Sequence, residues 1–315
     1  MTEPLFEEGR PRLGASGPVK VRVPAKVNLH LAVGAPRVDG YHEVTTVYHA
    51  ISVYDEVSAR RGDQLTLTME GEGAGILPLD ESNLVLCAAR ALAEDTGVAA
   101  RARLHLRKQI PVAGGLAGGS ADAAAALVAC DALWGTGLSR DELATIAARV
   151  GSDVPFLVHG GTALGTGRGE TVSPVLARAS AWHWVIAVAE VGLSTAAVYA
   201  ELDRLRAAGA ADPPLGPPDG LLGALRQRDP AVLAAALGND MHAAALSLRP
   251  SLAATLAAGQ KAGALAAMVS GSGPTCLFLA RDAGHASALA GELADSDTCR
   301  TALTATGPVA GARVV

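Results

Sequence analysis

The chain has 315 residues, which is more than one typical domain and fewer than three, and 50% of them are hydrophobic. Only 3% are aromatic, so we expect a core built mainly from Ala, Val and Leu. A formal net charge of −5 argues against nucleic acid or an anionic membrane as a partner, because either would need a basic face. The four cysteines fit no metal-ligand spacing, which predicts buried thiols in a reducing cytoplasm.

The first segment, residues 1–17, combines acidic residues, prolines and glycines without the pattern of a signal peptide, so we expect a loose tail. From residue 19 to about residue 68 the sequence mostly alternates between apolar and polar residues, which predicts strands. In VPAKVNLHL this alternation places Lys26, Asn28 and His30 on one strand face. A single strand lysine is usually a solvated surface charge, and the strand pattern alone leaves that alternative open.

Residues 83–151 contain two further predicted helices and one predicted strand besides the glycine-rich stretch. Residues 83–97 predict a helix closed by glycine, and residues 102–111 predict a strand. Residues 139–151 predict a helix that begins with a capping box, because Ser139 and Glu142 are three positions apart.

The second half of the chain is richer in Ala and Leu. Residues 181–190 predict a buried strand, and residues 207–220 predict a surface loop between helices. The apolar stretch 262–280 is interrupted by Ser-Gly-Ser-Gly-Pro, which favours a buried element over a membrane span. A β-rich first half and an α+β second half predict two domains, residues 18–175 and 176–315.

In the stretch PVAGGLAGGSADAAAA, residues 111–126, four glycines precede an alanine-rich run with strong helix propensity. This pattern predicts a loop followed by a helix whose N-cap is Ser120. Backbone N–H groups at a helix N-terminus bind phosphate, and a tight packing turn would need fewer glycines. The loop has no Lys-Ser/Thr of a Walker A motif, and Leu116 occupies the place of the second Rossmann glycine. We expect Asp122, in the first helical turn, to complement the helix dipole.

Three motifs occur in a fixed order: PAKVNL at residues 24–29, PVAGGLAGGSA at 111–121 and SGSGPT at 270–275. Together they resemble the GHMP superfamily of small-molecule kinases, named for galactokinase, homoserine, mevalonate and phosphomevalonate kinases. Ala113 departs from the glycine or methionine of many members. The resemblance implies an α+β fold of two domains: a β-rich N-terminal ATP-binding domain and a ferredoxin-like C-terminal domain, with the active site in the cleft between them.

Two further stretches, VDGYHEVTT and GSDVPFLVHGGTALGTGRGE, resemble one branch of that superfamily. Its members use ATP to phosphorylate the 2-hydroxyl of a cytidine diphosphate-linked methylerythritol in the non-mevalonate route to isoprenoids. The resemblance therefore implies ATP with Mg²⁺, a small-molecule substrate, a cytoplasmic location and a monomer or weak homodimer. Another superfamily kinase, of homoserine or mevalonate type, and a non-catalytic ATP-binding regulator are the alternatives.

Asp153 follows a helix stop at Gly151, and Pro155 favours an extended Val154, so the carboxylate is expected on a fixed turn. From the sequence alone, an aspartate that merely caps a turn is as good an explanation. The resemblance implies that Asp153 is the catalytic base and that Lys26 lies beside it, keeps it ionised and offsets phosphoryl charge.

The resemblance also assigns the binding residues. Asn28 would orient the hydroxyl, Tyr41 and Tyr199 would stack on the two faces of cytosine, and His42 would bind the edge of the base. Ser120 is a candidate Mg²⁺ ligand, and the remaining metal ligands are unknown. The phosphate loop comprises Pro111, Val112, Ala113, Gly114, Gly115, Leu116, Ala117, Gly118, Gly119, Ser120 and Ala121, and the remaining substrate-side residues are Thr195, Gly271, Ser272 and Gly273.

Overall fold

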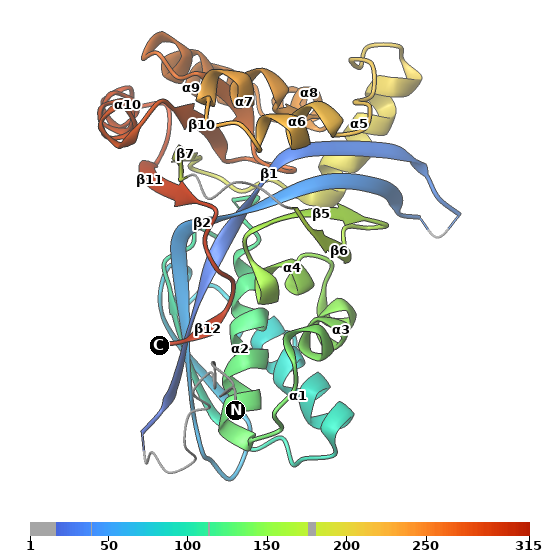
Figure 1. Ribbon diagram of the computed structural model, residues 1–315, viewed down its shortest axis with the longest axis vertical. Coiled ribbons are helices and arrows are strands. Elements are labelled where there is room, and N and C mark those ends of the chain that lie inside the picture. The colour runs from blue at the N-terminus through green and yellow to red at the C-terminus, as the bar shows by residue number, and fades with distance from the viewer. Residues whose placement is uncertain (1–16, 39, 113, 176–180) are drawn as a thin grey trace, which may run out of the picture.

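The computed structural model describes residues 17–38, 40–112, 114–175 and 181–315. Within these residues the chain forms two sheets with helices packed on them, an α+β fold (Figure 1). Nearly all of the expected tail, and Ala113 of the glycine loop, lie outside the described residues. None of the helices in the described ranges is long and apolar enough to cross a bilayer.

The N-terminal part is built on an eight-stranded sheet whose main path is β12-β1-β2-β4-β3. A short arm of β5 and β6 extends from β2, and β8 pairs with β1. The strands are β1 (Val19–Pro36), β2 (His42–Arg60), β3 (Thr66–Gly71), β4 (Arg103–Lys108), β5 (Thr162–Thr166), β6 (Thr171–Pro174), β8 (Gly238–Asn239) and β12 (Arg313–Val314).

β1 does not alternate cleanly as the sequence predicts. Its central residues are buried on both faces, because helices cover one side and the second sheet packs near the other. One extra residue between Asn28 and His30 shifts the register against β2, a β-bulge that interrupts the two-residue period. The expectation that His30 shares a face with Lys26 and Asn28 is therefore wrong: His30 interacts with the Gly216 backbone near Asp240.

Four helices pack beside this sheet: α1 (Leu84–Thr96), α2 (Gly118–Trp134), α3 (Arg140–Val150) and α4 (Val154–His159). The left-handed glycine that ends α1 and the capping box that begins α3 are both confirmed. Most residues of the central helix α2 are buried, and its run of small alanines allows close packing against β1, β2, α1 and α4.

The C-terminal part contains a four-stranded antiparallel sheet in the order β11-β7-β10-β9. In chain order this arrangement is 4-1-3-2, which is the ferredoxin-like pattern expected. Its strands are β7 (Trp182–Val188), β9 (Ala266–Val269), β10 (Cys276–Ala280) and β11 (Thr301–Gly307). Its helices are α5 (Thr195–Ala207), α6 (Asp219–Ala224), α7 (Pro230–Ala236), α8 (His242–Leu248), α9 (Ser251–Lys261) and α10 (Ala283–Asp295).

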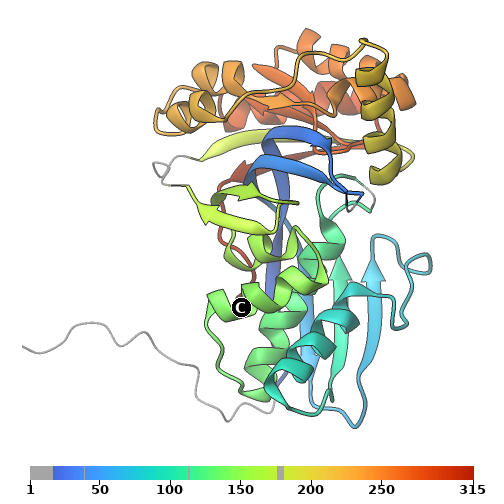
Figure 2. The same ribbon diagram turned by 90° about the vertical axis from the view of Figure 1, so that its right-hand side faces the viewer.

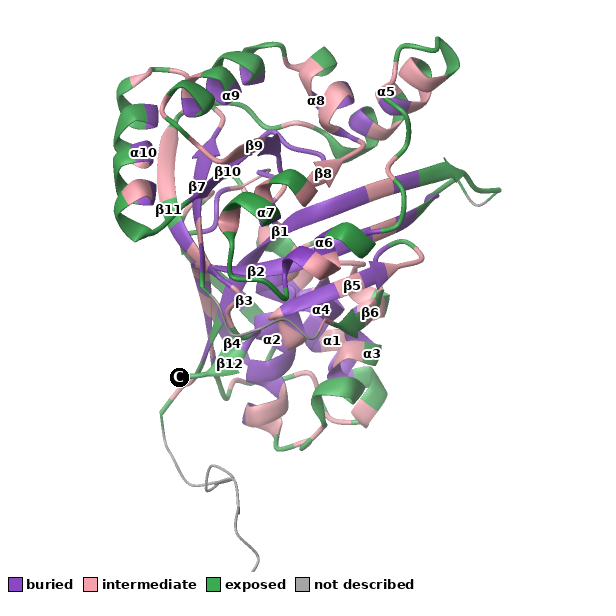
Figure 3. Cartoon of the chain, turned by 45° about the horizontal axis from the view of Figure 1, so that its top comes forward, coloured by how far each residue is buried: buried purple, intermediate pink, exposed green. Residues whose placement is uncertain are grey.

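The two faces of this second sheet pack differently. Helices α9 and α10 cover one face and present their exposed sides to solvent (Figure 3). The other face, with Trp184 and Ile186, joins the same hydrophobic core as β1, β2 and α2. Thus one core runs through both parts of the chain.

Long strands connect the two parts. β1 and β2 have 18 and 19 residues and extend from the helix-covered base to the second sheet (Figures 1 and 2). The chain end returns to the first sheet, where β12 pairs with β1. Cys130 and Cys276 are buried as expected, whereas Cys87 and Cys299 are only half-buried, and all four thiols are free.

Candidate active site

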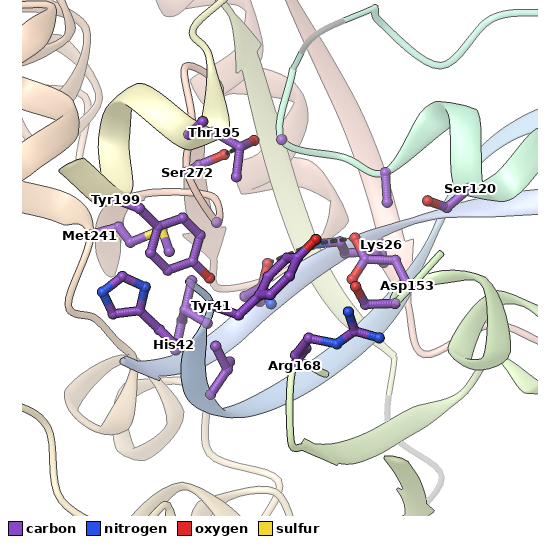
Figure 4. A pocket seen from close by; sticks show the side chains of 18 of the residues that line it. Lys26, Tyr41, His42, Ser120, Asp153, Arg168, Thr195, Tyr199, Met241 and Ser272 are labelled. Carbon is purple, nitrogen blue, oxygen red and sulfur yellow. Dashed lines mark hydrogen bonds and ion pairs between the residues drawn. The ribbon is translucent and has the colours of Figure 1, made fainter. Parts of the chain in front are cut away.

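A cavity of about 850 Å³ lies where the two parts meet (Figure 4). Its walls come from β1 and β2, the glycine loop at the start of α2, the residues before α4, helix α5, and the turn between β9 and β10. All three sequence motifs therefore meet at one cavity, although they are separated by most of the length of the chain.

The catalytic pair expected from sequence lies in this cavity. Lys26 is only 6% exposed, and its Nζ lies 3.4 Å from Asp153 Oδ2. Lys26 Nζ also donates a hydrogen bond to Asn28 Oδ1 over 2.8 Å, and Asn28 Nδ2 donates to Thr46 Oγ1 over 2.7 Å. The ammonium is thus held by a carboxylate and an amide rather than solvated, which excludes the alternative of a surface charge.

Asp153 occupies the residue before α4, with φ −83° and ψ −14°, and its side chain makes no capping hydrogen bond. The alternative of a turn-capping aspartate is therefore excluded. The expectation of an extended Val154 is wrong, because Val154 is the first residue of α4 and Pro155 lies in its first turn, where proline is tolerated. Asp153 Oδ1 accepts a hydrogen bond from the Tyr48 hydroxyl over 2.9 Å.

The glycine loop lines the cavity through Gly114, Gly115, Ala117, Gly118, Gly119 and Ser120. Pro111, Val112, Leu116 and Ala121 do not line it, and Leu116 and Ala121 are buried in the core. Helix α2 begins at Gly118 and the left-handed Ala117 precedes it, so the expected N-cap at Ser120 is wrong. Starting the helix earlier places Ser120 in its first turn, where the backbone N–H groups are unpaired.

The glycine loop also contacts the turn between β9 and β10. Gly115 has φ +72°, and a Cβ there would lie 2.5 Å from the Ser270 carbonyl oxygen. Of the expected residues in that turn, Gly271 and Ser272 line the cavity and Gly273 does not. Ser272 and Thr195 share a hydroxyl hydrogen bond of 2.9 Å, which links this turn to α5.

Asn239 is a residue that the sequence analysis missed. Its Nδ2 donates to the carbonyl oxygens of Val269 and Gly271 over 2.9 and 2.8 Å, and so fixes the backbone of the turn. In the sequence, an Asn-Asp pair directly after Gly238 is the only sign of this role. The pair does not indicate the partners of Asn239, which lie on the β9–β10 hairpin about thirty residues further along the chain.

The expected helix-dipole role of Asp122 is wrong, because Asp122 lies beyond the first turn of α2 and pairs with Lys108. It is 4% exposed, and its Oδ2 accepts a 2.7 Å hydrogen bond from Lys108 Nζ, which donates equally to Asp55. Burial and the charge of Asp55 raise the pKa of Asp122 well above its usual value. Burial lowers the pKa of Lys108, but the two carboxylates outweigh it and the net shift is upward.

This buried cluster lies directly under the glycine loop. A Cβ on Gly118 would lie 3.0 Å from Lys108 Nζ. Gly118 therefore provides room for the ion pair beneath the loop as well as an open surface above it.

Aromatic rings gather at the other end of the cavity. The His42 ring stacks on Tyr199 at 4.8 Å, and the Arg168 guanidinium lies 4.9 Å from the Tyr41 ring centroid. In the view of Figure 4, Tyr41 lies between Tyr199 and Arg168. Burial, followed by the charge of Asp153, raises the pKa of Tyr199 to about 12.

Asp203 is a second residue that the sequence patterns did not indicate, and its carboxylate binds the His42 ring. His42 Nε2 lies 3.0 Å from Asp203 Oδ1 and 3.1 Å from Oδ2. Because a carboxylate accepts hydrogen bonds, Nε2 is the nitrogen that donates. The spacing of Tyr199 and Asp203 by four residues on α5 places both on one helix face and could have indicated this contact.

Two family comparisons agree with this arrangement. Residues 83–161 match the GHMP kinases N terminal domain, and residues 221–297 match the GHMP kinases C terminal domain. The first match contains the glycine loop and Asp153, and the second contains the turn between β9 and β10.

Individual proteins match this chain over nearly its whole length. A 4-diphosphocytidyl-2-C-methyl-D-erythritol kinase of Salinispora tropica is 75% identical over 308 residues, with 98% of each chain covered. The enzyme of the same name from Mycobacterium tuberculosis is 58% identical and covers 95% of this chain and 94% of its own. A crystal structure of 4-(cytidine 5'-diphospho)-2C-methyl-D-erythritol kinase superposes with a TM-score of 0.74 at 30% identity, covering 91% of this chain and 98% of its own.

Proposed function

Because the chain belongs to the 4-diphosphocytidyl-2-C-methyl-D-erythritol kinases of the GHMP kinase family, we propose that it phosphorylates the 2-hydroxyl of 4-diphosphocytidyl-2-C-methyl-D-erythritol with ATP. The product would enter the non-mevalonate route to isoprenoid precursors. The observation that most directly supports phosphoryl transfer is the close pair of Lys26 and Asp153 in the cavity that the glycine loop lines.

Asp153 is the base of the proposed reaction. It accepts the proton of the substrate hydroxyl as the hydroxyl oxygen forms a bond to the γ-phosphorus of ATP, and the bond from that phosphorus to the β–γ bridging oxygen breaks to release ADP. Lys26 offsets the negative charge that develops on the attacking oxygen and the moving phosphoryl group. Asn28 helps to orient the hydroxyl through Lys26, since its amide is engaged by Lys26 and Thr46.

The glycine loop binds the phosphates of ATP in this proposal. Its glycines expose backbone N–H groups at the start of α2, and the helix N-terminus favours negative charge.

Mg²⁺ is the metal that ATP-dependent phosphoryl transfer ordinarily requires, and it neutralises phosphate charge. Among the described residues, no cluster of three or more His, Cys, Asp or Glu could hold a metal. Mg²⁺ bound to substrate phosphates usually keeps several waters and needs few protein ligands. The Ser120 hydroxyl, which lines the cavity, would be that ligand.

The aromatic end of the cavity binds cytosine. Arg168 already covers one face of Tyr41 and His42 one face of Tyr199, so the base must use the other face of each tyrosine. The proposed domains are residues 18–175 for ATP and 176–315 for the substrate. Thr195, Gly271 and Ser272 complete the substrate side, whereas Gly273 shapes the turn behind them without lining the cavity.

The test is ADP release with a panel of alcohols: the cytidine diphosphate substrate, mevalonate, homoserine and galactose. The proposal predicts turnover with the cytidine substrate at a specificity constant far above the others. Preferred use of mevalonate or homoserine would instead support another kinase of the superfamily, and ATP binding without turnover would support a regulator. We further propose a cytoplasmic enzyme that is a monomer or weak homodimer.

A further inference from the structure

Tyr48 lies against the proposed catalytic pair but belongs to none of the sequence motifs. It is on β2, is 3% exposed, and donates its hydroxyl hydrogen to Asp153 Oδ1 over 2.9 Å. Lys26 Nζ lies 5.4 Å from the centroid of the same ring. One side chain thus touches both members of the pair.

The Tyr48 ring is fixed by its surroundings. It stacks on Phe156 of α4 at a centroid distance of 4.9 Å. A Cβ at Gly165 would lie 2.5 Å from Tyr48 Cε2, and a Cβ at Gly169 would lie 2.2 Å from the Tyr48 hydroxyl oxygen. Two glycines of the GGTALGTGRGE stretch therefore leave the space that the ring and its hydroxyl fill.

The two oxygens of Asp153 consequently have different partners. Oδ1 accepts from Tyr48, whereas Oδ2 faces the Lys26 ammonium at 3.4 Å. Burial and the neighbouring carboxylate raise the pKa of Tyr48 well above its ordinary value, so the phenol stays protonated and acts only as a donor toward Asp153.

We propose that Tyr48 is a positioning residue for the phosphoryl transfer: it fixes the Asp153 carboxylate so that Oδ2, beside Lys26, takes the hydroxyl proton. Tyr48 itself binds neither ATP nor the cytidine substrate. This inference rests on the proposed function, because it assigns Asp153 as the base.

The test is Tyr48→Phe, which retains the ring and its stack on Phe156 and removes only the hydroxyl. Loss of one hydrogen bond to a charged group should lower kcat about ten- to hundredfold. The KM values for ATP and for the cytidine substrate should stay within about twofold.

Tyr54→Phe is the matched control. Tyr54 is on the same strand, and its ring faces Arg22 at 5.2 Å instead of the cavity. Loss of the Tyr54 hydroxyl should change neither kcat nor either KM.

A second variant, Gly169→Ala, disturbs the hydrogen bond between Tyr48 and Asp153 without changing either residue. Gly169→Ala would press a methyl group onto the Tyr48 hydroxyl and should also lower kcat. Gly169 has φ +104°, so part of the loss in Gly169→Ala is backbone strain. The part caused by the clash with the hydroxyl is absent in the double variant with Tyr48→Phe, whose loss in kcat should be smaller than the product of the two single losses.

A Tyr48→Phe enzyme with an unchanged kcat would overturn the positioning role, and so would a Tyr48→Phe enzyme in which either KM rises and kcat does not fall. Failure of the unsubstituted enzyme to turn over the cytidine substrate would instead overturn the proposed function.

Discussion

Replacing Asp153 with Asn tests the proposed base with the smallest change of shape. Asn retains an oxygen that can accept from Tyr48, so the hydrogen bond now 2.9 Å long can persist. What disappears is the charge that lies 3.4 Å from Lys26 and the basicity needed to take the hydroxyl proton. The substitution therefore removes the chemistry and leaves the local geometry nearly intact.

The expected magnitude follows from that difference. Loss of a general base costs on the order of 10²–10⁴ in rate, which corresponds to about 2.7–5.4 kcal/mol of transition-state stabilisation. In the proposed function both substrates are bound mainly by other parts of the cavity, so their dissociation constants should change little. Lys26→Met should lose activity to a similar extent, and the double variant should be scarcely worse than the poorer single variant, because the two residues act as a unit.

The assay is coupled ADP release at saturating concentrations of both substrates, with binding measured separately by calorimetry. Asp95→Asn is a suitable control, because Asp95 is an exposed partner of Arg149 away from the cavity. A kcat for Asp153→Asn within tenfold of the unsubstituted enzyme would refute Asp153 as the base.

Three other predictions test the ends of the cavity and the core. Tyr41→Ala and Tyr199→Ala should each raise the KM for the cytidine substrate roughly ten- to hundredfold, from the loss of base stacking, and leave the KM for ATP unchanged; steady-state kinetics would contradict this if ATP affinity fell instead. Gly119→Val should raise the Kd of an ATP analogue with little change in Tm, because a Cβ there meets only Leu84 Cδ1 at 3.6 Å, and an unchanged Kd would argue against phosphate binding by the loop. Burial lowers the pKa of His49 to about 3 from an ordinary value of 6.5, so the unfolded chain binds more protons between these values and stability falls as pH falls. From pH 7 to pH 5, urea unfolding should show the unsubstituted protein losing about 2 kcal/mol more than His49→Gln, and equal losses would rule out a neutral buried imidazole.

Local patterns in the sequence were enough to predict much of the fold. The capping box at Ser139 and the left-handed glycine after α1 depend on residues a few positions apart, and both are confirmed. The glycine loop at the start of α2 is also a local feature. The placement of Lys26 beside Asp153 needed the family resemblance, because no pattern within either motif refers to the other.

The contacts that sequence reasoning missed are long-range. Tyr48 and Asp153 are 105 positions apart, and Lys108 and Asp55 are 53 apart. The sequence predicts Asp122 to be an acid in the first turn of a helix. Its burial is explained by the ion pair with Lys108 of β4, which no local pattern indicates. The β-bulge before His30 has no marker in the alternating pattern, since it depends on pairing with β2.

The identity of the phosphorylated product tests the central proposal most directly. Incubation of the enzyme with ATP, Mg²⁺ and 4-diphosphocytidyl-2-C-methyl-D-erythritol, followed by ³¹P NMR, should show one new phosphate monoester on the 2-hydroxyl, formed in step with ADP and with the cytidine diphosphate group unchanged. ATP hydrolysis to inorganic phosphate without that monoester, or a monoester formed equally well on mevalonate or homoserine, would contradict it.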